Sequence, residues 1–151
     1  MVPQPDPNIR GIRLERPQET NKPKSTLNRD QQRAAWAYES VYGLATEVSF
    51  DNYRTLVNGL GANLIRSGLV ATISFVQRYH DKEARDALFE HLGNEGGLAH
   101  LECIRKRPTE EPLPTTIRGL KLEDYMLATR EMMRLAQWLK RACQAKKAGA
   151  E

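Results

Sequence analysis

A row of basic side chains near the C-terminus is the feature of this sequence best suited to chemistry. Arg130, Arg134, Gln137 and Arg141 stand at offsets of 0, 4, 7 and 11, so a helix places them on one face, with Lys140 beside them. A guanidinium group donates two hydrogen bonds at once to a phosphate, and such contacts position a nucleic acid without reading its sequence. The spacing therefore predicts a surface that binds a polyanion.

The distribution of charge favours the same interpretation. The segment 120–147 has seven basic and three acidic residues, whereas the rest of the chain has 16 of each, so the whole formal charge of +4 lies in this segment. A helix face that only meets solvent usually mixes both signs, as residues 29–47 do. Localised positive charge of this kind is typical of a surface that meets nucleic acid.

Two other groups of residues are weaker candidates for a functional site, one for a metal site and one for a general base. His91, His100 and Cys103 resemble metal ligands, but a zinc site needs a complete ligand set and a glycine-rich run separates His91 from the other two. His80 and Asp81 resemble a general base with an orienting carboxylate, but adjacent residues seldom meet in that geometry. We expect these side chains to be structural, with no metal site.

Known catalytic signatures are absent from the sequence. There is no phosphate-binding GxxxxGK[ST] loop, no HExxH, no GxSxG and no Rossmann glycine pattern. We therefore expect a protein that is not an enzyme and that needs no cofactor. A small nuclease that uses His80 or His91 with scattered carboxylates stays open as a competing hypothesis.

Helical periodicity extends through most of the chain, and no segment alternates as a strand does. Asn28 and Gln31 resemble a capping box that starts a first helix over 30–48. Asp51 is the expected cap of a second helix, which ends at Gly68. The further predicted segments are a third helix that fades at 79–81, a fourth over 83–92, a brief fifth around 98–107, and a proline-rich loop over 108–119.

The last predicted helix is the longest, from about Leu122 to Lys147, or on the order of 40 Å. Its expected inward stripe consists of Leu122, Tyr125, Met126, Thr129, Met132, Met133, Ala136, Leu139 and Cys143. These segments predict an all-α fold, a compact bundle of about five to six helices with a long C-terminal helix.

Three regions follow from composition. Residues 1–24 hold five prolines and eight charges, which predicts a flexible arm and no signal peptide. Residues 25–147 are the expected single helical domain, and 148–151 a C-terminal tail. No apolar run approaches the roughly 20 residues that span a bilayer, so we expect a cytoplasmic protein without a membrane partner.

Three stretches, in the same order and with similar spacing, resemble a known family across about residues 29–143. They are RAAWAYE at Arg33–Glu39, YRTLVNGLGANLIRSGLVATISF at Tyr53–Phe75, and YMLATREMMRLAQWLKRAC at Tyr125–Cys143. Together they are similar to the small subunit of the type III-B CRISPR effector, the Cmr complex. The resemblance implies an all-helical subunit of an antiviral ribonucleoprotein that stacks with copies of itself beside other subunits.

The resemblance also implies contact with the backbone of guide RNA and target RNA, while base pairing reads the sequence. Target cleavage in that family belongs to a different subunit. The implied candidates for RNA contact or for fixing the fold are Arg33 in RAAWAYE, Arg130 in ATRE, and Lys140 and Arg141 in WLKR; Arg134 joins them from the stripe. Alternatively, Arg130 and Glu131 form internal salt bridges and Arg33 pairs in the neighbourhood of Glu39. A different function is also open, that of a helical protein–protein adaptor whose basic face meets an acidic partner.

Overall fold

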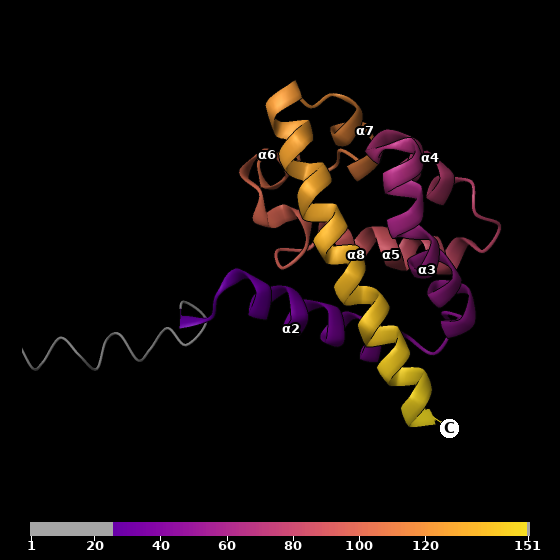
Figure 1. The fold of residues 1–151 in the computed structure, drawn as a ribbon. Helices are drawn as coiled ribbons and strands as arrows, with labels where there is room; N and C mark the ends of the chain where they lie inside the picture. The colour runs from indigo at the N-terminus through magenta and orange to yellow at the C-terminus, as the bar shows by residue number, and fades with distance from the viewer. Residues whose placement is uncertain (1–25, 151) are drawn as a thin grey trace, which may run out of the picture. The chain divides into compact units, whose positions relative to one another are not determined.

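The computed structural model of the chain describes residues 26–150, which contain seven α-helices, a short 3-10 helix and no β-strand. The elements are α2 (Arg29–Tyr42), α3 (Phe50–Ser67), α4 (Leu69–Gln77), α5 (Lys82–Gly93), η2 (Leu98–His100), α6 (Glu102–Arg105), α7 (Leu113–Arg118) and α8 (Leu122–Ala150). The predicted all-α class and long C-terminal helix are confirmed (Figure 1). Across this described part, the helices are too short or too polar to cross a membrane.

The chain divides into two units, Met1–Gln32 and Arg33–Glu151. In the described end of the first unit, the Gln31 amide donates to Asn28 Oδ1 at 2.8 Å, and the Asn28 amide donates to Gln31 Oε1 at 2.9 Å. This reciprocal pair is a capping box, as the sequence predicts, and it explains why α2 begins at Arg29. The predicted arm, residues 1–24, lies outside the described residues.

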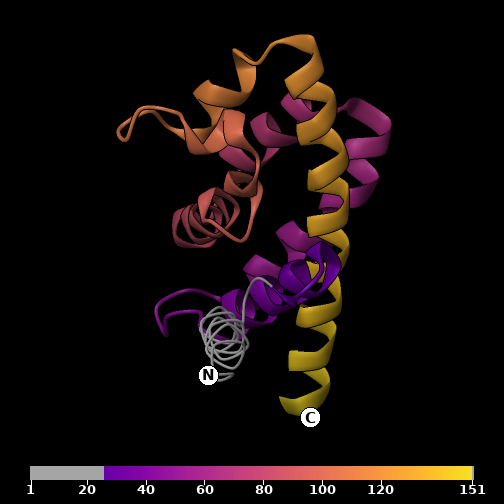
Figure 2. The ribbon, with the colours of Figure 1, turned by 90° about the vertical axis from the view of Figure 1, so that its left-hand side faces the viewer.

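The second unit is built around α3, which packs against α8, α4 and α5. Farther along the chain, α4 packs against α7, and α6 packs against η2 and α7. Both ribbon views show α6 and α7 beside the N-terminal half of α8 (Figures 1 and 2). The inward residues predicted for α3 are all buried: Tyr53, Leu56, Val57, Leu60 and Leu64.

Short polar residues and one glycine set the ends of the central helices. Ser49 caps α3, because its hydroxyl accepts a hydrogen bond from the Asn52 amide at 3.2 Å, so the predicted cap at Asp51 is wrong by two residues. Asp81 caps α5 in the same way through the Ala84 amide. Gly68 ends α3 as predicted, and its φ of 89° lies in a region that favours glycine.

The first helix ends earlier than its apolar pattern predicts, at Tyr42 instead of residue 48. Gly43 follows immediately, and a Cβ at this position would lie only 2.8 Å from the carbonyl oxygen of Glu39. The chain therefore turns sharply at a position where only glycine fits.

The predicted loop over 108–119 is wrong in its second half, which forms α7. Pro114 lies in the first turn of this helix, where the missing N–H of proline has no intrahelical partner to lose. The inward face of α7, with Leu113, Pro114, Thr116 and Ile117, is buried, so tertiary packing stabilises a segment whose prolines suggest a loop.

The inward stripe predicted for α8 is correct over its middle and wrong at its beginning. Met132, Ala136, Leu139 and Cys143 are buried, whereas Leu122 is 72% exposed and Met126 is 51% exposed. The buried face of the helix also includes Ala128, Leu135 and Ala142.

Candidate nucleic-acid interface

The row of basic residues lies on the exposed face of α8. Arg130, Arg134, Gln137 and Arg141 are all exposed, and so is Lys140 beside them. The opposite face packs into the core and holds the row outward, because residues at offsets of three and four share one side of a helix. We call Arg130, Arg134, Lys140 and Arg141 the basic row.

The described part of the chain provides no carboxylate that neutralises the basic row. Among the ion pairs of residues 26–150, none joins a carboxylate to any of its four members. Other exposed cations of the chain do have such partners: Lys82 pairs with Asp86, and Lys106 pairs with Glu102, each at 2.9 Å. The donors of the basic row therefore face solvent, where phosphate oxygens can reach them.

Arg33 differs from the other candidates because it is buried. Its Nε donates to Glu131 Oε2 at 2.9 Å, and its Nη2 donates to Glu131 Oε1 at 2.8 Å, so one guanidinium holds both oxygens of one carboxylate. The sequence left Arg33 with two roles, contact with RNA or fixing the fold. This paired geometry supports the second role, and it joins α2 to the middle of α8.

Glu131 consequently pairs with Arg33 and leaves Arg130 exposed. The internal salt bridge that the sequence suggested for Glu131 exists, but its basic partner is a residue 98 positions away. Because Glu131 pairs with Arg33, it does not neutralise the row, and the carboxylate that Arg33 pairs with is Glu131 instead of one near Glu39.

Lys146 contributes to the surplus of basic residues in the sequence but belongs to the fold. Its ammonium group lies 4.8 Å from the centroid of the Phe50 ring and donates to the carbonyl oxygen of Val41 at 3.2 Å. Arg54 lies over the same ring at 6.0 Å. These contacts attach the C-terminal part of α8 to the end of α2 and the start of α3.

The histidines proposed for chemistry have structural contacts. The Tyr53 hydroxyl and His91 Nδ1 lie 2.7 Å apart, and Trp36 Nε1 donates to the His91 carbonyl oxygen at 2.9 Å. Burial lowers the pKa of His91, which favours the neutral ring. His80 is exposed, with its ring 4.4 Å from that of Tyr79.

Asp81 is likewise occupied. It accepts hydrogen bonds from the Asn52 side chain at 2.5 Å and from the Ala84 amide at 3.3 Å, and these bonds lower the pKa of its carboxyl group. This carboxylate serves as a helix cap and connects α5 to α3. Residues 26–150 contain no cluster of three or more histidine, cysteine or acidic side chains that could hold a metal ion.

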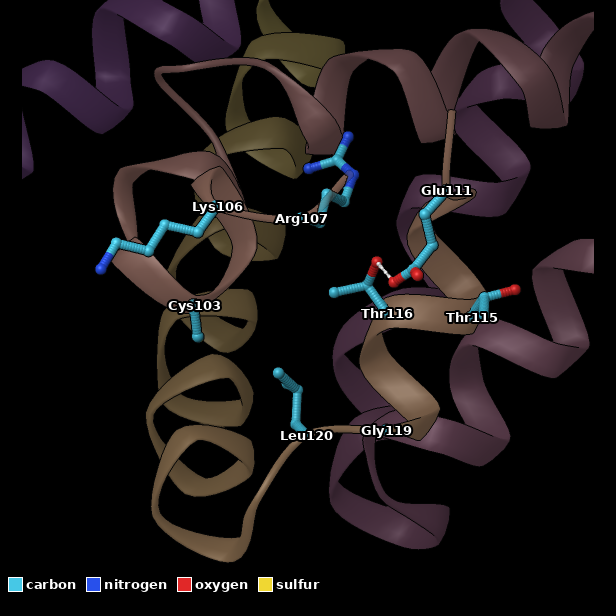
Figure 3. Close-up of a pocket in the computed structure, with 8 residues that line it drawn as sticks. All are labelled: Cys103, Lys106, Arg107, Glu111, Thr115, Thr116, Gly119 and Leu120. Carbon is cyan, nitrogen blue, oxygen red and sulfur yellow. Dashed lines mark hydrogen bonds between the residues drawn. The ribbon is translucent and has the colours of Figure 1, made fainter. Parts of the chain in front are cut away.

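A cavity of about 470 Å³ lies beside α6, α7 and Leu120 (Figure 3). Figure 3 shows Lys106 directed away from the cavity. The Thr116 hydroxyl donates a hydrogen bond to Glu111 Oε2 at 2.5 Å. Arg107 Nη1 donates to the Ile104 carbonyl oxygen, and its Nη2 lies against Gly93 at the end of α5. The polar side chains around this cavity thus serve local structure.

The two cysteines do not form a reactive site. Burial raises the pKa of the Cys143 thiol to about 11, despite the opposing charges of Arg54 and Lys146. Burial also raises the pKa of Cys103, and Asp124 raises it further. Both thiols are therefore protonated near neutral pH, as expected for cysteines that pack as small apolar residues.

Comparison with known proteins places this helical arrangement in a family. Residues 29–146 match the family described as "CRISPR-associated protein (Cas_Cmr5)". The chain belongs to the Cmr5 family. It is thus the small subunit of the type III-B Cmr complex, and its partners include the other subunits of that complex.

A solved structure supports the assignment to the Cmr5 family. It is the X-ray crystal structure of a CRISPR-associated Cmr5 family protein from Thermus thermophilus, which shares 27% sequence identity with this chain. The similarity covers 80% of this chain and 97% of that one, with a TM-score of 0.62. No curated protein matches the sequence.

Sequence reasoning missed one feature of the candidate interface, the contact between Arg141 and Trp138. The guanidinium carbon of Arg141 lies 4.7 Å from the centroid of the Trp138 ring. Their spacing of three residues is a signal that could have found it, since such pairs are neighbours on a helix surface.

Proposed function

We propose that this Cmr5-family subunit is a non-catalytic RNA-binding component of the type III-B ribonucleoprotein. In this proposal, the basic row on α8 contacts backbone phosphates of the guide RNA and the target RNA. The observation that carries it is the exposure of Arg130, Arg134, Lys140 and Arg141 without a carboxylate partner among the described residues.

The length of the basic row suits a nucleic-acid backbone. Arg130 and Arg141 are 11 residues apart, which corresponds to about 16 Å along a helix. One strand of double-stranded DNA advances about 3.4 Å per nucleotide along its axis, so a row of this length can follow several consecutive nucleotides of a nucleic acid. Guanidinium and ammonium groups bind backbone phosphates whatever the base sequence. A subunit needs such sequence-independent contacts when base pairing selects the target.

The proposal of a non-catalytic role rests on the contacts of the candidate catalytic groups. Asp81 caps α5, and His91 Nδ1 is hydrogen-bonded to the Tyr53 hydroxyl, so both groups already have structural contacts. A nuclease that depends on His80 would need a carboxylate to orient it, and Asp81 is bound by Asn52 and Ala84 instead.

We further propose that copies of this subunit stack on one another and on neighbouring subunits. Several large apolar side chains remain exposed, namely Ile65, Phe75, Leu122, Met126 and Leu127. Exposed apolar residues are suited to the buried centre of a protein interface, where methionine and aromatic residues are enriched.

A salt series tests the RNA proposal. The full chain, alone and assembled with its partner subunits, is titrated with single-stranded RNA over a range of salt concentrations. The variant Arg130→Gln/Arg134→Gln should bind more weakly, and its log–log salt slope should be shallower by about 0.7 for each phosphate that it no longer neutralises. The matched control is Lys82→Gln/Lys106→Gln, which removes the same charge from two exposed lysines that already have carboxylate partners.

The outcome separates the competing functions. Equal losses in the two variants would mean that only net charge matters and would contradict a dedicated interface. RNA binding that is absent even in the assembled complex, together with salt-dependent binding of an acidic partner protein, would support the adaptor instead. RNA cleavage that disappears in His80→Ala would support the nuclease.

A further inference from the structure

The cation–π contact between Arg141 and Trp138 differs from the other cation–π contacts of the described residues. Lys146 lies over Phe50 but also donates to Val41, and Arg54 lies over Phe50 but also donates to Asp51. These two cations therefore combine an aromatic contact with a polar partner inside the protein.

Arg141 has the aromatic contact without such a polar partner among residues 26–150. Its guanidinium carbon lies 4.7 Å from the centre of the Trp138 ring, and the side chain is exposed. Within residues 26–150, it forms no ion pair with a carboxylate. A ring face attracts the cation but supplies no oxygen acceptor, so the contact restrains the guanidinium while its N–H donors stay accessible.

The position of Trp138 on α8 suits this restraint. Trp138 is half-buried, and its neighbour Leu139 is fully buried, so the ring stands at the border between the core and the basic row. A ring held partly by the core is a firmer support for an arginine than a solvent-exposed ring would be. Ordering a long side chain on binding lowers affinity, and a support that orders it in advance removes that cost.

We propose that Trp138 is a positioning residue that holds Arg141 in place for a backbone phosphate of RNA. This inference rests on the proposed function of the basic row. It adds that Arg141 is the preorganised member of the row and that its contribution to RNA affinity depends on a residue that does not touch the RNA.

The two residues then have different signatures in a salt series. Loss of Arg141 removes a phosphate contact, so it lowers affinity and also makes the log–log salt slope shallower by about 0.7. Loss of Trp138 leaves the arginine and its charge in place, so affinity falls by about 2- to 10-fold while the salt slope is unchanged.

A double-mutant cycle tests the proposal on the full chain in the assembled complex. The variants are Trp138→Leu, Arg141→Gln and the double variant, with single-stranded RNA as the probe. Trp138→Leu should weaken binding when Arg141 is present and should have no effect when Arg141 is already glutamine. Trp138→Phe and Trp138→Tyr keep an aromatic ring and should lie between the wild type and Trp138→Leu.

Phe50→Leu is the control variant. Phe50 belongs to α3, and its loss removes the ring beneath Lys146, a cation of α8 that is outside the basic row. Circular dichroism confirms that each variant is folded, and Trp138→Phe carries the test if Trp138→Leu unfolds. Equal weakening by Trp138→Leu in both Arg141 backgrounds would overturn the positioning role while the proposed RNA interface stands. A wild type that binds no RNA, or binds it without salt dependence, would instead overturn the proposed function itself.

Discussion

The buried ion pair between Arg33 and Glu131 gives the sharpest prediction for stability. The two side chains are 9% and 7% exposed, and two hydrogen bonds of 2.8 and 2.9 Å join them. Glu131→Met removes the carboxylate and leaves a guanidinium group that stays protonated at any ordinary pH. Removing one partner of a buried pair costs about 3–5 kcal/mol, because the remaining charge stays in the interior and loses the opposite charge that offset its burial. At about 2–4 °C per kcal/mol for a chain of this length, we expect the melting temperature to fall by roughly 6–20 °C.

Urea unfolding followed by circular dichroism measures this change in the free energy of unfolding. Arg33→Met/Glu131→Met removes both charges and should be more stable than Glu131→Met, since no guanidinium group stays in the interior after losing the Glu131 carboxylate. Glu102→Met is the matched control, because Glu102 pairs with Lys106 at the surface at a similar distance, and its loss should cost less than about 1 kcal/mol. If Glu131→Met and Glu102→Met unfolded at the same urea concentration, the reasoning about the buried pair would be refuted.

Three further predictions concern the helices that support α8. Gly96→Ala places a Cβ 2.9 Å from Trp36 and should destabilise the protein by about 1–3 kcal/mol. The Cβ of Gly61→Ala meets nothing within 4 Å and should stabilise α3 by up to about 1 kcal/mol. Urea unfolding that ranks the two variants in the opposite order would contradict this reasoning. Ser49→Ala removes the cap of α3 and should cost about 1 kcal/mol by thermal unfolding, and an unchanged melting temperature would show that Ser49 is not needed as a cap. Burial lowers the pKa of His91 from 6.5, so the unfolded chain binds a proton at His91 more readily than the folded chain does. The neutral, buried His91 ring therefore contributes stability that is complete above about pH 6.5 and is lost as the pH falls through the lowered pKa. His91→Gln should therefore flatten the dependence of the urea midpoint on pH between about 5 and 7.5, and an unchanged slope would show that another group titrates.

The proposal that the basic row is an RNA interface depends on two kinds of information. The offsets of Arg130, Arg134 and Arg141 are a local property of a helix, so the sequence alone predicted that they share a face, and their exposure confirms it. The partner of each cation is a tertiary property. Only the packed structure shows that Lys146 binds Val41 and Phe50, so that it belongs to the fold.

Periodicity and composition by themselves determined the helical class and the central helices of this protein. Its capping box at Asn28 and Gln31 and its helix end at Gly68 follow from hydrogen bonds and backbone angles within a few residues, which is why the sequence predicted them. The three family stretches also lie within single helices or adjacent ones, so the resemblance is visible in the sequence alone.

Tertiary structure decided the features that depend on which distant residue or neighbouring helix packs against a side chain. Arg33 pairs with Glu131 across 98 positions, a separation that no local pattern encodes. α7 forms because its apolar face is buried, although its prolines suggest a loop. Leu122 and Met126 continue the apolar periodicity of α8 yet lie exposed, because a period shows which residues share a face but not where a neighbouring helix covers that face.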